Sequence, residues 1–67
     1  MYKIQCNKVF KGEGNKKAFV SNNPKTSENA SFTTNEKFAY EFNNMAICKN
    51  VRDDILYVAD SVTIFKV

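Results

Sequence analysis

The stretch 33–49 carries the strongest helical pattern in the chain. Its large apolar side chains recur at helical spacing, and they are Phe38, Phe42 and Met45, continued by the stem of Lys49. Side chains three or four residues apart lie on the same side of a helix. Thr33 followed by Glu36 matches a capping box, in which a hydroxyl and a carboxylate each bind a free backbone amide at the helix start. We therefore predict a helix that begins near Thr33 and covers a sheet.

The segments before this helix have the pattern of strands. In residues 2–11 apolar and polar side chains alternate, which is typical of a strand with one buried face. The glycine-rich residues 12–15 predict a turn, and residues 16–21 predict the returning strand. Residues 21–31 contain no large apolar side chain and hold the only proline. A surface loop is expected there.

The C-terminal part has two interpretations. Residues 55–59 and 62–67 are rich in β-branched and aromatic side chains, and Asp60 with Ser61 between them fits a tight turn, which predicts a second hairpin. Alternatively, a helix capped by Asn50 is marked by apolar residues at helical spacing, namely Val51, Ile55, Val58, Ala59 and Val62. The first interpretation gives a single α+β domain over residues 1–67 in the order ββαββ, with one antiparallel sheet packed against one helix.

The residue types present argue against catalysis. The chain has no histidine, which removes the commonest general base and metal ligand. Cys6 and Cys48 lack the spacing of a metal or redox motif, so two buried free thiols are expected. The adjacent Asp53 and Asp54 are interpreted as a solvated turn. We therefore expect a protein that is not an enzyme and that needs no metal or other cofactor.

Charge and cysteine content narrow the expected partners and compartment. Two cysteines, no export signal in the opening MYKIQCNK and no apolar run of about 20 residues predict a cytoplasmic protein without a membrane partner. Ten basic and seven acidic residues give a net charge of +3, which favours encounters with acidic proteins and with nucleic acids. Arg52 is the only arginine, and this argues against sequence-specific reading of DNA.

The predicted helix offers one candidate binding surface. Tyr40 and Ile47 lie on the side of the helix away from the apolar stripe, where a surface helix is normally polar. This second face consists of Lys37, Tyr40, Asn44 and Ile47. We predict that it binds a partner protein, and it is also compatible with a homodimer.

The first hairpin offers the alternative surface. Basic side chains gather around its tip beside an aromatic ring, and they are Lys8, Lys11, Lys16 and Lys17 with Phe19. Lysine binds phosphate and an aromatic ring stacks on a base, so this set predicts binding of a single-stranded nucleic acid. The competing interpretation is that the ring belongs to the core and the lysines protect the sheet from pairing with other strands.

The overall pattern resembles the small phage proteins that bind and disable a host enzyme. The elements that carry the resemblance are a hairpin, a polar loop, a helix entry with the sequence FTTNEKFA and a β-rich C-terminus. The resemblance is architectural, covers most of the chain and assigns no site residue. It implies a non-enzymatic inhibitor of a host macromolecule, by preference a host protein, acting in the host cytoplasm. The positive charge departs from what an inhibitor that mimics nucleic acid would need.

Overall fold

The computed structural model describes residues 1–67, and its centre is a long hairpin. Strand β1 (Tyr2–Phe10) pairs antiparallel with β2 (Gly14–Val20). The Glu13 N–H closes the turn by donating to the Phe10 carbonyl at 3.0 Å. Gly12 has a φ of 80°, in the left-handed region that glycine enters without a steric penalty. The hairpin predicted from the alternation and the glycines is therefore confirmed.

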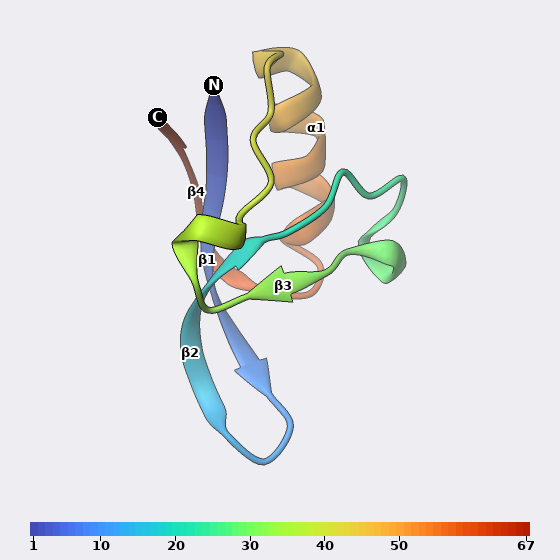
Figure 1. Ribbon diagram of the computed structural model, residues 1–67. Coiled ribbons are helices and arrows are strands. Elements are labelled where there is room, and N and C mark those ends of the chain that lie inside the picture. Colours follow the sequence, from blue (N-terminus) through green and yellow to red (C-terminus); the bar gives the residue numbers. More distant parts are fainter.

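Two further strands complete the sheet. Strand β3 (Phe32–Thr33) lies beside β2, and β4 (Asp60–Lys66) lies beside β1, so the order across the sheet is β3-β2-β1-β4. Every pairing is antiparallel, and one helix packs on the sheet (Figure 1). The predicted class, an antiparallel sheet with a single helix, is confirmed. The element order differs from ββαββ, because three strands precede the helix and one follows it.

Helix α1 (Met45–Ile55) begins later than the sequence pattern predicted. Its cap is Asn44, whose side-chain oxygen accepts from the N–H groups of Ala46 and Ile47 at 2.8 and 3.2 Å. A side-chain cap of this kind stabilises a helix by about 1 kcal/mol. The predicted start at Thr33 was wrong, because Thr33 belongs to β3 and its hydroxyl accepts instead from the Asn35 N–H.

The segment between β3 and α1 is mostly extended. It contains only the short 3₁₀ turn η2 (Glu36–Phe38). Beyond it, the Tyr40 N–H donates to the Val20 carbonyl at 2.9 Å, and Phe42 exchanges two backbone hydrogen bonds with Tyr2, at 2.7 and 2.8 Å. These long-range bonds hold residues 40–42 beside the sheet. Pairing with the sheet therefore overrides the local helical spacing of the phenylalanines.

The predicted second hairpin was also wrong. Ile55 is the last residue of α1, residues 56–58 form a turn, and β4 pairs with β1. The alternative helix was correct for Val51 and Ile55, which α1 buries. Its proposed cap, Asn50, lies inside α1, and Val62 lies in β4.

One face of the sheet and the helix form the core. Helix α1 contributes Cys48, Val51 and Ile55 to a cluster of nine buried residues. The other members come from the sheet and its flanking segments, and they are Ile4, Cys6, Ala18, Val20, Phe42 and Ala59. Burial of this apolar surface is the main source of stability in so small a domain.

The opposite face of the sheet has a smaller aromatic contact. The rings of Phe19 and Phe65 meet edge to face with their centroids 6.1 Å apart. Lys3 points to this face, because it alternates with the core residue Ile4. Its ammonium donates to the Glu36 carbonyl at 3.0 Å, so η2 lies on this side of the sheet. Phe19 is only 3% exposed.

The expected loop over residues 21–31 connects β2 to β3. It contains the 3₁₀ turn η1 (Ser27–Asn29). The Asn22 side chain holds the loop closed by donating to the Asn29 carbonyl and accepting from the Ser31 N–H, both at 2.9 Å. Pro24 is the one buried residue of the loop.

Candidate binding surfaces

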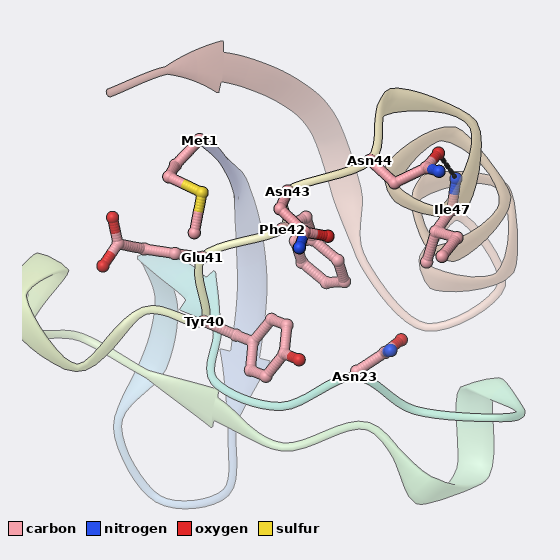
Figure 2. A pocket seen from close by; sticks show the side chains of 8 residues that line it. All are labelled: Met1, Asn23, Tyr40, Glu41, Phe42, Asn43, Asn44 and Ile47. Carbon is pink, nitrogen blue, oxygen red and sulfur yellow. Dashed lines mark hydrogen bonds between the residues drawn. The ribbon is translucent and has the colours of Figure 1, made fainter.

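Three of the four residues predicted on the second helix face meet around a small pocket. Tyr40, Asn44 and Ile47 line it together with their neighbours in residues 40–44 and with Met1 and Asn23 (Figure 2). We call it the Tyr40 pocket. Lys37, the fourth predicted residue, lies on η2 and does not line it. The residues are brought together by the extended segment and the start of α1, and not by one face of a helix.

The Tyr40 pocket has little room for a partner. Its volume is about 100 Å³, which equals the share of roughly three water molecules. The Tyr40 ring lies edge to face against Phe42, with centroids 4.7 Å apart, and the Asn44 oxygen is used as the helix cap, as the dashed line in Figure 2 shows. Tyr40 and Asn44 therefore both have structural contacts within the domain.

A larger groove, which the sequence analysis missed, lies beside β1. One wall is formed by Asn7, Lys8 and Val9, and the other by residues 56–60, and its volume is about 340 Å³. We call it the Leu56 groove. Four large apolar side chains that line it are exposed, namely Val9, Leu56, Tyr57 and Val58. Tyr57 is 84% exposed and Val9 is 68% exposed, so the groove is the place where exposed apolar surface is concentrated.

The end of α1 explains why these residues face outward. The N–H groups of Val58 and Ala59 both donate to the Ile55 carbonyl at 2.9 Å, which closes the chain into a last turn. Ile55 and Ala59 are buried, while Leu56, Tyr57 and Val58 between them are exposed. The signal in the sequence was a run of five apolar residues, 55–59, which is too long for all of its side chains to lie on the one buried face of a helix.

The lysine-rich hairpin does not present its predicted residues on one face. Lys8 lies opposite Lys16 in the register, whereas Lys17 alternates to the other side of the sheet. The Lys8 ammonium lies 4.9 Å from the centroid of the Phe32 ring, and Lys16 pairs with Glu13 at 2.9 Å. Lys11 is exposed in the turn at the hairpin tip, which extends beyond the rest of the molecule in Figure 1.

The aromatic member of that set is already covered. The centroid of the Phe19 ring lies 5.9 Å from the Lys17 ammonium, and the ring contacts Phe65. Because Phe19 is only 3% exposed, it has no free ring face on which a base could stack. The tip therefore presents positive charge without an aromatic platform. This geometry favours electrostatic contact over stacking.

Both cysteines are free and buried, as the sequence predicted. Burial raises the pKa of the Cys6 thiol, and Lys8 nearby partly opposes this rise. Burial likewise raises the pKa of the Cys48 thiol, partly opposed by Arg52. The neutral thiol is thus favoured in the folded state. This contribution to stability is complete below the pKa of the unfolded thiols, and it is lost as the pH rises from there through the folded pKa values.

We therefore expect the free energy of unfolding to fall as the pH rises above about 8.5, the usual thiol pKa. Urea denaturation at several pH values measures this decrease, and the double variant Cys6→Ala, Cys48→Ala is the control in which the thiol contribution is absent.

Both thiols should react with a thiol reagent at once in denaturant and only slowly in the native protein. Reductant should leave the thermal midpoint unchanged, and a drop of several degrees would contradict the free thiols.

The remaining features and the comparisons with known proteins add no assignment. No group of three or more histidine, cysteine, aspartate or glutamate side chains that could hold a metal ion is present. None of the helices has the length and apolar character needed to cross a membrane. Comparison of the chain with protein-family models, with curated proteins and with solved structures found no match.

Proposed function

We propose that this protein is a non-enzymatic binding domain that attaches to another protein through the Leu56 groove. The observation that supports this is the concentration of exposed apolar side chains there, with Tyr57 and Leu56 exposed by 84% and 55%. Aromatic and large apolar residues that project from a surface are the usual anchors of protein interfaces. The Tyr40 pocket, with less than a third of the volume, is the weaker candidate.

We further propose that the partner is a host protein and that binding blocks its activity. This part of the proposal rests on the resemblance of the chain to small phage inhibitor proteins. Nucleic acid is the alternative partner, supported by the exposed lysines of the hairpin tip, Lys11 and Lys17.

The test is capture of partners from a host lysate by the tagged protein, with and without nuclease. The variant Leu56→Ser, Tyr57→Ser removes the two anchors, and we expect it to lose the captured protein while remaining folded, because both side chains are largely exposed. Phe38→Ser is the matched control, since Phe38 is an aromatic residue on η2 whose exposure of 69% lies between those of Leu56 and Tyr57.

The other outcomes separate the alternatives. Capture that disappears on nuclease treatment would show that nucleic acid is the partner. Capture that survives the groove variant but is lost in Ile47→Ser would move the interface to the Tyr40 pocket. Retention of the partner by every variant except Phe38→Ser would contradict both surfaces.

A further inference from the structure

Strand β1 has an open edge where it borders the Leu56 groove. Its pairing with β2 continues to Phe10, which lies opposite Gly14. Its pairing with β4 stops at Asn7, which lies opposite Asp60. Residues 8–10 of β1 therefore have a neighbouring strand on one side only. An open stretch of strand beside a groove is a template for an added strand.

The hydrogen bonds of β1 show which backbone groups face this open edge. In an antiparallel sheet, the N–H and C=O groups of one residue point to the same neighbour, and successive residues alternate. The Phe10 carbonyl accepts from Glu13 on the β2 side, and Tyr2 bonds to Phe42, which follows β2 along the same side of β1. The register between β1 and β2 is continuous. Even-numbered residues thus face β2, and Val9 directs its N–H and C=O to the open edge.

The pairing of β4 agrees with this assignment. The Val67 N–H donates to the Met1 carbonyl at 2.9 Å, so the odd-numbered residues at this end of β1 face β4. The register between β1 and β4 shifts between Gln5 and Asn7, so that two residues of β4, Ser61 and Val62, lie opposite the single residue Cys6. This irregularity is a β-bulge in β4. Ser61 has a φ of 52°. Beyond the bulge the ladder has one more pair, Asn7 with Asp60, and it stops there because β4 begins at Asp60, which leaves the Val9 groups without a partner strand.

The charges around the open edge indicate the chemistry of the occupant. Lys8 lines the groove and Lys11 follows it at the hairpin tip, while Asp60 lies at the opposite end. The hairpin from Lys8 to Lys17 carries four lysines and one glutamate, so its net charge is positive although Lys16 pairs with that glutamate. The Lys8 ammonium lies over the Phe32 ring and Lys17 is on the other side of the sheet, which leaves Lys11 as the unpaired charge at the tip. An occupant with carboxylates toward the tip and an apolar side chain against Leu56 complements this arrangement.

We propose that the Leu56 groove receives an extended acidic segment of the partner protein, which pairs with the backbone of Val9 as a short added strand. The pairing orients the segment, and Leu56 and Tyr57 contact its apolar side chain. This inference rests on the proposed function and specifies the form and charge of the partner at the same groove.

The experiment uses a displayed library of random 12-residue peptides, selected on the wild-type protein. The chain is short enough for chemical synthesis, so a version can be prepared in which the backbone nitrogen of Val9 carries a methyl group. This methyl group removes the outward N–H and leaves every side chain unchanged. The matched control is N-methylated at Ile64. By the alternation from Val67, the Ile64 N–H also faces away from β1, but at the outer edge of β4. Circular dichroism and the thermal midpoint establish that both remain folded.

We expect the enriched peptides to combine aspartate or glutamate with a large apolar residue. Their affinity should fall about tenfold on N-methylation at Val9, the size of one lost interface hydrogen bond, and should not change on N-methylation at Ile64. Loss of binding in Leu56→Ser without any effect of the methyl group at Val9 would overturn the added strand and leave the proposed function intact. Enrichment of basic or uncharged peptides would overturn the acidic partner. A selection that yields no Leu56-dependent peptide would contradict the inference and the proposed function together.

Discussion

Phe42→Ala should unfold the domain or bring it close to unfolding. The Phe42 side chain is 2% exposed and belongs to the core cluster shared by α1 and the sheet. Truncation of a buried phenylalanine costs about 3–5 kcal/mol, and a domain of this size has little more than that in total stability. Urea or thermal denaturation followed by circular dichroism measures the loss.

Phe38→Ala is the matched control for this prediction. Both phenylalanines were assigned to one buried stripe by the sequence pattern, but Phe38 is 69% exposed. Its truncation should change the free energy of unfolding by no more than about 0.5 kcal/mol. If the two variants were equally destabilised, the segment 33–49 would be the predicted helix, and the extended conformation of residues 40–42 would be wrong.

The second large effect is expected at the end of α1. Ile55→Ala should lower the free energy of unfolding by about 2–5 kcal/mol, because Ile55 is 0% exposed and its truncation leaves a cavity between the helix and the sheet. Leu56→Ala, one residue later, should cost far less, since more than half of the Leu56 side chain is already in water. Equilibrium denaturation in urea compares the two variants under the same conditions.

This pair also tests the local structure. In a strand, adjacent side chains point to opposite faces, so a large difference between Ile55 and Leu56 alone does not exclude the predicted second hairpin. Tyr57→Ala separates the two arrangements. A strand would bury Tyr57 on the same face as Ile55 and make its truncation costly, whereas the observed turn leaves Tyr57 exposed and its truncation nearly neutral. If Tyr57→Ala lowered the free energy of unfolding by several kcal/mol, the predicted second hairpin would be correct and the observed turn would be wrong.

The first hairpin could be predicted because everything that determines it is local. Alternating side chains and the glycines of the turn lie within one continuous segment, and the register follows from the turn. The helix was misplaced because its position depends on distant residues. Nothing near Phe42 in the sequence indicates that its backbone pairs with Tyr2, or that Asn44 is a better cap than Thr33.

The candidate site could be predicted only in part, because its assembly also depends on residues that are distant in the sequence. Tyr40, Asn44 and Ile47 do lie together, although an extended segment and a helix start assemble them in place of one helix face. The Leu56 groove was missed because residues 55–59 were assigned to a strand, which would have buried Tyr57. Only the position of the helix end shows that Leu56 and Tyr57 have no place in the core.

The strand order has a consequence for how the chain reaches this fold. β1 is the first strand to be synthesised, and one of its two neighbours, β4, is the last. The hairpin of β1 and β2 closes over a short turn, whereas the pairing of Tyr2 with Lys66 must close a loop that includes almost all of the residues. Closing the longer loop loses more conformational entropy, and the pairing forms more slowly. A nascent chain therefore carries its central strand with one whole edge unpaired until β4 arrives. Misassembly with other unfinished chains is thus a hazard of synthesis, and docking of the last strand reduces it to the short edge at residues 8–10.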